Sequence, residues 1–120
     1  MFSGLLLSDG YLTVQELELR DLAPYRVVLA ACESSADIAY AGGELLGFVS
    51  ALIARGTAGV LGSIQLVPDE ATAPFMLRVH EQLRDEVTLA AALHGARASL
   101  DRDDPADLVN WCGFTAYGAA

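Results

Sequence analysis

Cys32 is the residue whose type and position most clearly suggest chemistry. It directly follows residues 27–31, a continuous apolar run that is β-branched at its start. Such a run predicts a strand buried on both faces, of the kind found in parallel sheets. Binding sites in open α/β sheets form beyond the carboxyl ends of the strands, where this thiol would lie. A thiol there can act as a nucleophile, but free cysteine is also among the residue types most often buried in cores.

A thiol nucleophile needs a base, usually a histidine, to accept its proton. The chain contains two histidines, His80 and His94, and both follow Cys32 in the sequence. The hydrophobic spacing places each of them within a predicted helix rather than at a strand end. We interpret both as packed or solvated helix residues. The residues alone therefore indicate a candidate nucleophile without a convincing base, and a core role for Cys32 stays open.

Other cysteine chemistries lack their partner residues. A phosphatase loop needs an arginine shortly after the cysteine, and residues 33–41 contain none. A thioredoxin-type pair needs a second cysteine three positions on, where the chain has Ser35. The two cysteines, 80 positions apart, form neither a zinc pattern nor a disulfide framework, and no glycine-rich phosphate loop is present. We therefore expect no metal and no cofactor.

Strands and helices alternate along the chain in a way that would position Cys32 at a sheet edge. Apolar runs predict strands over residues 3–8, 27–31, 58–64 and 110–117. Start signals predict helices after Thr13, from Gly43, after Asp69 and after Thr88. This order indicates an α/β protein with a parallel or mixed sheet and helices on both faces.

The hydrophobic spacing also predicts which side chains face the core. In the helix from Gly43, one face carries Leu45, Leu46, Val49, Leu52 and Ile53, and Arg55 with Gly56 forms a helix stop. Pro74 should kink the next helix or delay its start. The inner residues of that helix are Met76, Val79 and Leu83, and those of the Thr88 helix are Leu89, Ala92, Leu93, Ala96 and Leu100. In the last predicted strand, Cys112, Phe114 and Ala116 lie on one side, which would place Cys112 in the core.

Composition limits the classes of function. The 120 residues suffice for a single domain with a core. Sixteen acidic residues against seven basic ones give a net charge of −9, which disfavours binding to nucleic acid. We find neither an apolar run of membrane-spanning length nor a signal peptide, so we expect a cytoplasmic protein without membrane contact.

Six segments together resemble the C-terminal part of CHAT domains, caspase-like domains related to clan CD cysteine peptidases. The segments are "LLLSDGYLTVQEL", "VVLAACESS", "GGELLGFVSALIARGTAGVLGSI", "VPDEATAPFM", "LAAALHGA" and "WCGFTAYG". They follow the family's order and spacing over essentially the whole chain. The third and fourth look like the bacterial branch best known from actinobacteria, which suggests a role in bacterial signalling.

The resemblance implies a fold and a reaction. The fold is the caspase–hemoglobinase type, a three-layer α/β/α sandwich with a mostly parallel sheet. Residues 1–120 would be a single CHAT-like domain fragment, the half that bears the nucleophile. Cys32 occupies the position of the catalytic cysteine, which attacks a peptide carbonyl. A histidine accepts and then donates the proton, and main-chain amides, among them that of Cys32, stabilise the oxyanion.

Residues near two predicted strand ends would border the substrate. Glu33, Ser34 and Ser35 are expected to line the mouth of the site, and Ser63 and Gln65 to border the pocket from the neighbouring strand. Gln65 departs from the family, which usually has tryptophan there, so the resemblance does not give the substrate preference.

The family's histidine belongs to a segment upstream of the one that matches "SGLLLSDG". Only 31 residues precede Cys32, and none is a histidine. We therefore expect a cysteine endopeptidase module for protein substrates that is inactive as the isolated chain, with the histidine supplied by a partner segment or subunit. The alternative is a non-catalytic, caspase-like module for interaction or homo-oligomerisation. A doubly wound small-molecule binder is a third hypothesis, disfavoured because no phosphate-binding motif is present.

Overall fold

The computed structural model describes residues 4–7, 10–21, 23–30, 41–63 and 69–120. The strands are β1 (Gly4–Leu7), β2 (Gly10–Thr13), β3 (Arg26–Leu29), β4 (Gly59–Ser63) and β5 (Phe114–Gly118). The helices are α1 (Val14–Arg20), α2 (Ala41–Ala54), α3 (Asp69–Leu83), α4 (Leu89–Arg97) and α5 (Pro105–Gly113). None of these helices is long and apolar enough to cross a membrane.

The central sheet has the strand order β3-β4-β5. Strands β3 and β4 are parallel, with Arg26 beside Gly59 and Leu29 beside Gly62. Strand β5 is antiparallel to β4, with Phe114 beside Ser63. Strands β1 and β2 form a separate antiparallel hairpin. The predicted α/β class is confirmed, and this part of the sheet is mixed, with one parallel and one antiparallel pair.

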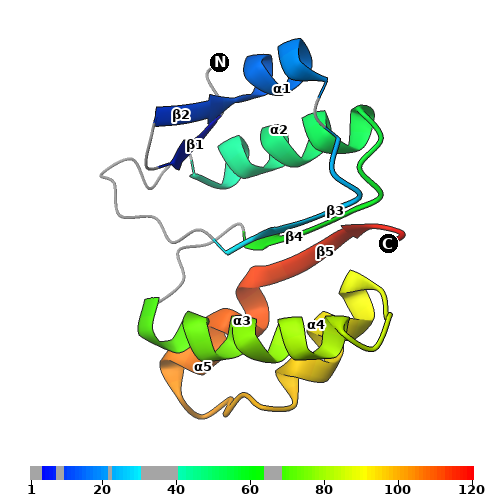
Figure 1. The fold of residues 1–120 in the computed structure, drawn as a ribbon. Helices are drawn as coiled ribbons and strands as arrows, with labels where there is room; N and C mark the ends of the chain where they lie inside the picture. The colour runs from blue at the N-terminus through cyan, green and yellow to red at the C-terminus, as the bar shows by residue number, and fades with distance from the viewer. Residues whose placement is uncertain (1–3, 8–9, 22, 31–40, 64–68) are drawn as a thin grey trace.

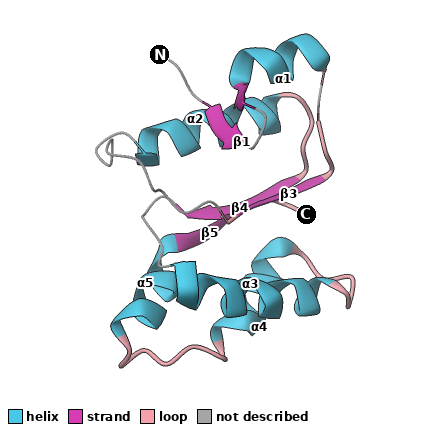
Figure 2. Cartoon of the chain, turned by 60° about the vertical axis from the view of Figure 1, so that its left-hand side comes forward, coloured by secondary structure: helices cyan, strands magenta, loops and turns pink. Residues whose placement is uncertain are grey.

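Helices cover both faces of this sheet, as predicted. Figure 1 shows α1 and α2 on one side and α3, α4 and α5 on the other, and Figure 2 shows the same division from a second direction. Successive side chains of a strand point to opposite faces. Val60 accordingly packs with the cluster of α1 and α2, which includes Leu17 and Leu52. Its neighbour Leu61 packs with the cluster of α3 and α4, which includes Phe75. The molecule therefore has three layers with β4 at its centre.

The predicted end of α2 is confirmed in detail. The helix ends at Ala54, and Gly56 has a positive φ of 110°. The N–H of Gly56 donates to the Ile53 carbonyl, and the N–H of Thr57 donates to the Leu52 carbonyl, each over 3.0 Å. This is the Schellman pattern, in which glycine takes the conformation that other residues avoid. It turns the chain back into β4.

Two predictions of burial are wrong in part. Leu46 and Ile53 of α2 are exposed, whereas Phe48, Val49 and Leu52 are buried. The face of α2 that packs on the sheet carries Phe48, Val49 and Leu52. Leu46 and Ile53 lie at the flanks of this face. The side chains of β3 are half-buried, whereas four of the five residues of β4 are buried. Strand β3 lies at one end of the described sheet, and a continuous apolar run does not distinguish an end strand from a central one.

The prediction of a strand over 110–117 is wrong in its first half. Residues up to Gly113 form helix α5, which starts at Pro105 with Asp104 as its N-cap. The Asp104 side chain accepts hydrogen bonds from the N–H groups of Ala106 and Asp107. An aspartate before a proline at the first helical position is a strong start signal, and it outweighs the apparent alternation after Asn110.

Several smaller predictions are decided by the hydrogen bonds. Thr13 and Thr88 cap α1 and α4, accepting from the N–H groups three residues later over 3.1 Å each. Helix α3 begins at Asp69 with Pro74 inside it, so the proline does not delay the start. Strand β2 was not predicted, because Asp9-Gly10 indicated a turn, Thr13 indicated a helix start, and residues 11 and 12 received no assignment.

Candidate functional site

The parallel pair brings two strand ends to the same edge of the sheet. Leu29, the last residue of β3, is beside Gly62, and Ser63 ends β4 one residue later. Cys32 follows Leu29 by three positions in the sequence, and Gln65 follows Ser63 by two. Because of this register, the residues that follow β3 and those that follow β4 leave the sheet from neighbouring strand ends. This is the arrangement in which α/β sheets form binding sites.

Of the predicted site residues, the structure places Ser63 alone. Its side chain is half-buried at the end of β4, opposite Phe114 of β5. Cys32, Glu33, Ser34, Ser35 and Gln65 lie outside the described residues. Their roles therefore stay predictions.

His80 lies on α3, exposed, with its ring Nδ1 2.7 Å from the Met76 carbonyl oxygen. Because a carbonyl only accepts, Nδ1 carries the proton of this hydrogen bond, and only Nε2 is left to act as a base. Figure 1 shows α3 starting on the side where β4 ends and running back along the sheet. His80 comes eleven residues after Asp69, which is about 16 Å along a helix axis. His80 is therefore distant from the carboxyl ends of β3 and β4.

His94 is exposed on α4. The buried face of this helix consists of Leu89, Ala92, Leu93 and Ala96, and His94 is not part of it. The interpretation of both histidines as ordinary helix residues agrees with the structure. Among the described residues, neither histidine forms a hydrogen bond with a strand end.

Cys112 is an exposed free thiol on α5, so its predicted place in the core is wrong. The residue lies one position before the end of a helix rather than in a strand, and this rotates it away from the side occupied by Phe114. Phe114 itself is buried and packs against Phe75, with ring centroids 5.6 Å apart. The exposed thiol can therefore serve as a reference for the reactivity of Cys32.

Two buried polar residues, which no sequence motif marks, join the helices that flank the site edge. Thr72 Oγ1 donates to Asn110 Oδ1 over 3.0 Å, joining the first turn of α3 to α5. Both residues are buried, and Asn110 Nδ2 has no hydrogen-bond partner. Helix α3 starts at Asp69, so this bond fixes the first turn of α3 against α5. The sequence around Thr72 and Asn110 contains no motif that predicts this hydrogen bond.

A third supporting residue is Arg97, in the last turn of α4. Its guanidinium donates to the Phe114 carbonyl over 2.9 Å. Phe114 is paired with Ser63, so Arg97 holds the start of β5 beside the end of β4. It also places a cation near the C-terminal end of α5, which stabilises the helix dipole.

Among the described residues, no three side chains of the histidine, cysteine, aspartate or glutamate type gather as metal ligands would. The acidic stretch before α5 uses its carboxylates as turn and helix caps. Asp107 accepts from the N–H of Asp101, and Asp101 accepts from the N–H of Asp103. These carboxylates have a structural role.

One comparison with known proteins identifies a family. The family model described as CHAT domain matches residues 1–119, which is nearly the full length of the chain. No curated protein matches the chain, and neither does any solved structure.

Proposed function

The chain belongs to the CHAT domain family, which is related to caspase-like cysteine peptidases, and on this premise we propose that Cys32 is the nucleophile of a cysteine endopeptidase module. The observation that carries the proposal is the coincidence of the family match with the parallel register of β3 and β4. The cysteine follows the first of two strands whose carboxyl ends meet at one edge. This is where an α/β sheet builds a site.

The proposed reaction is the one that the family relationship implies. The Cys32 thiolate attacks the carbonyl carbon of a peptide bond, and main-chain amides stabilise the oxyanion that forms. A histidine takes the thiol proton and then donates it to the leaving amine. Glu33, Ser34 and Ser35 on one side, with Ser63 and Gln65 on the other, are proposed to border the substrate.

The proton acceptor is proposed to come from outside residues 1–120. His80 and His94 both lie on exposed helix positions, and His80 Nδ1 is engaged with the Met76 carbonyl. Residues 1–120 alone are therefore expected to have no measurable peptidase activity. A hydrolysis rate that is lost in Cys32→Ala and in His80→Ala or His94→Ala would contradict this assignment of the base.

Alkylation across a range of pH tests the role of Cys32. Iodoacetamide labelling, mapped by mass spectrometry, compares Cys32 with the exposed Cys112 in the same molecule. An ordinary thiol has a pKa near 8.5, so at pH 6.5 only about 1 % is thiolate. A site built to stabilise an anion should lower the pKa of Cys32, and we expect it to label more than about tenfold faster than Cys112 at that pH.

Two variants separate the cysteines in this experiment. Cys112→Ser should leave the fast phase of labelling unchanged, and Cys32→Ser should remove it. A Cys32 that is inert, or that follows the pH profile of an ordinary thiol, would show that the chain has the family's fold without its chemistry.

A second candidate function is a non-catalytic module for interaction or oligomerisation. The observation that favours it is strand β3, which is half-buried and lies at one end of the described sheet. End strands offer main-chain groups for pairing with another chain. Sedimentation equilibrium should then give a mass above 12.7 kDa, unchanged by Cys32→Ala. A compact monomer would count against this function.

A further inference from the structure

Arg102 covers the ring of Trp111 at the surface of the layer that α3, α4 and α5 form. The central carbon of its guanidinium lies 4.9 Å from the centroid of the tryptophan ring. Arg102 precedes α5 and is exposed, whereas Trp111 lies in the last turn of that helix and is half-buried. A cation at this distance is attracted by the negative face of an aromatic ring. The ring of Trp111 is therefore a surface that accepts a cation.

Arg102 takes this position although carboxylates lie next to it in the sequence. Asp101 and Asp103 flank it directly. Among the described residues, however, the ion pairs involve other arginines, and Arg102 contacts the ring instead. An exposed contact of this kind changes an equilibrium by a factor of only about 2–5. Another cation that makes further contacts can therefore displace Arg102.

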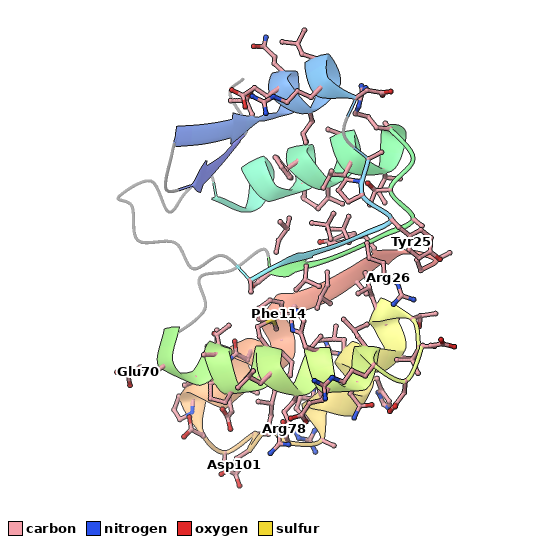
Figure 3. All side chains as sticks on the ribbon, viewed as in Figure 1. Tyr25, Arg26, Glu70, Arg78, Asp101 and Phe114 are labelled. Atoms are coloured by element: carbon pink, nitrogen blue, oxygen red, sulfur yellow. The ribbon has the colours of Figure 1, made fainter. Side chains whose placement is uncertain are left out.

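The segment around Arg102 attracts cations. Residues 101–107 contain four aspartates and one arginine, so four negative charges and one positive charge give a net −3. Three of these carboxylates accept main-chain N–H groups, whereas that of Asp103 forms no ion pair among the described residues. Figure 3 shows Asp101 in this segment, on the side of the helical layer that faces away from the sheet. A cationic side chain that approaches Trp111 from solvent therefore meets negative charge.

Leu108 lies beside Trp111 on the exposed side of α5. It is 43 % exposed, and a spacing of three residues places the two side chains on the same face of a helix. The buried residues of α5, Asn110 and Gly113, lie on the other side. Tryptophan and arginine are among the residue types that contribute most to the binding energy of protein interfaces. A partner fits this face if it offers an arginine to the ring and an apolar side chain to Leu108.

We propose that the face of α5 formed by Leu108 and Trp111 binds a segment of a partner protein, and that an arginine of this segment displaces Arg102 from the Trp111 ring. Arg102 is then an internal occupant that covers the ring until the partner binds. A chain with a net charge of −9 repels a second copy of itself and attracts a basic segment. The inference goes beyond both proposed functions, because neither Cys32 nor strand β3 takes part in it.

Fluorescence tests the partner chemistry directly, because Trp111 is the single tryptophan of the chain. Peptides selected from a random library that lacks tryptophan should contain an arginine near an apolar residue. Binding of a selected peptide should change the emission of Trp111. Replacing the arginine of that peptide with glutamine should lower its affinity roughly 5- to 30-fold, the range for a cation–π contact that loses water on binding. Replacement with lysine should lower it less, because the charge is kept and the planar stacking is lost.

Arg102→Ala tests the displacement. This variant uncovers the ring without removing a buried side chain, so the affinity for a selected peptide should rise about 2- to 5-fold. Arg20→Ala is the matched control, because it removes the same charge from an exposed position on α1, which Figure 1 shows across the sheet from α5. A larger effect of Arg102→Ala than of Arg20→Ala is expected.

Trp111→Leu separates the ring from the local charge. It should lower the affinity roughly 5- to 30-fold. In this background, Arg102→Ala should no longer raise the affinity beyond the Arg20→Ala control, because there is no ring to uncover. Circular dichroism checks that Trp111→Leu folds, and the comparison of Arg102→Ala with Arg20→Ala decides the question if it does not.

Three results would overturn the inference. They are a selection that enriches no arginine, a peptide affinity that is equal in Trp111→Leu, and an effect of Arg102→Ala no larger than that of Arg20→Ala. Labelling of Cys32 and sedimentation equilibrium test the two proposed functions separately. Failure of this inference would therefore leave both of those functions standing.

Discussion

Thr72 and Asn110 form a hydrogen bond in the interior between α3 and α5. Asn110 is fully buried and its Nδ2 has no partner, so among the described residues its side chain is hydrogen-bonded through Oδ1 alone. The Thr72 hydroxyl therefore satisfies the acceptor of a side chain that water does not reach. Loss of that hydroxyl would leave the whole buried amide unpaired.

Replacing Thr72 with valine, which has nearly the same shape, should lower the free energy of unfolding by about 1–3 kcal/mol, the cost of an unsatisfied buried polar group. Urea denaturation followed by circular dichroism measures the change. Thr115→Val on the exposed face of β5 is the control and should change the stability by less than about 0.5 kcal/mol. Equal effects of the two substitutions would show that the buried bond contributes nothing specific.

At the scale of an element, two glycines have a positive φ for different reasons, one in the turn between α2 and β4 and the other at the end of β5. Gly56 (φ 110°) lies beyond α2 in open space, with no atom within 4 Å of an added Cβ. Gly118 (φ 86°) ends β5, and an added Cβ would come within 2.3 Å of the Ala58 carbonyl oxygen. At Gly56 the backbone conformation alone requires glycine. At Gly118 the close approach of the Ala58 main chain requires it as well.

Alanine at these two positions should therefore have unequal effects. Gly56→Ala should lower the free energy of unfolding by about 1–2 kcal/mol through conformational strain alone. Gly118→Ala adds a clash with main chain and should lower it by on the order of 3–5 kcal/mol. Thermal and urea denaturation of both variants measure this difference. If Gly118→Ala were no worse than Gly56→Ala, the close approach of β5 to Ala58 would be wrong.

At the scale of the whole molecule, β4 joins two apolar clusters and the surface carries a large excess of negative charge. Val60 and Leu61, both fully buried, belong to the clusters on opposite faces of the sheet. The two recorded ion pairs lie at the surface and involve few of the sixteen acidic residues. Repulsion within a net charge of −9 is stronger in the folded state, because folding brings the charges together.

Salt should therefore stabilise the protein. Raising NaCl from about 10 mM to about 1 M shortens the Debye length from roughly 30 to roughly 3 Å, which should raise the melting temperature. In a triple variant of exposed acids (Glu18→Gln, Asp85→Asn, Asp103→Asn) the net charge of −9 becomes −9 + 3 = −6, and the salt effect should be smaller. An equal salt effect in both proteins would assign it to the apolar core rather than to charge.

Local signals in the sequence determined a large part of this fold. Thr13 and Thr88 cap their helices and Gly56 stops α2, each as predicted, and the buried strand predicted over 58–64 forms as β4. The family was also identified from sequence segments, and the match over residues 1–119 confirms it. These features depend on neighbours within a few positions, so a short window contains the physics that decides them.

Tertiary structure alone decided what each element meets. An apolar run does not show whether another strand pairs beside it, and β3 proved to be half-buried. Cys112 was expected in the core and is exposed, because a helix rather than a strand carries it. At the candidate site, the structure places Ser63 and adds its supports Thr72, Asn110 and Arg97, whereas Cys32 stays a prediction from sequence. Burial and pairing depend on segments distant along the chain, and only the folded structure brings those together.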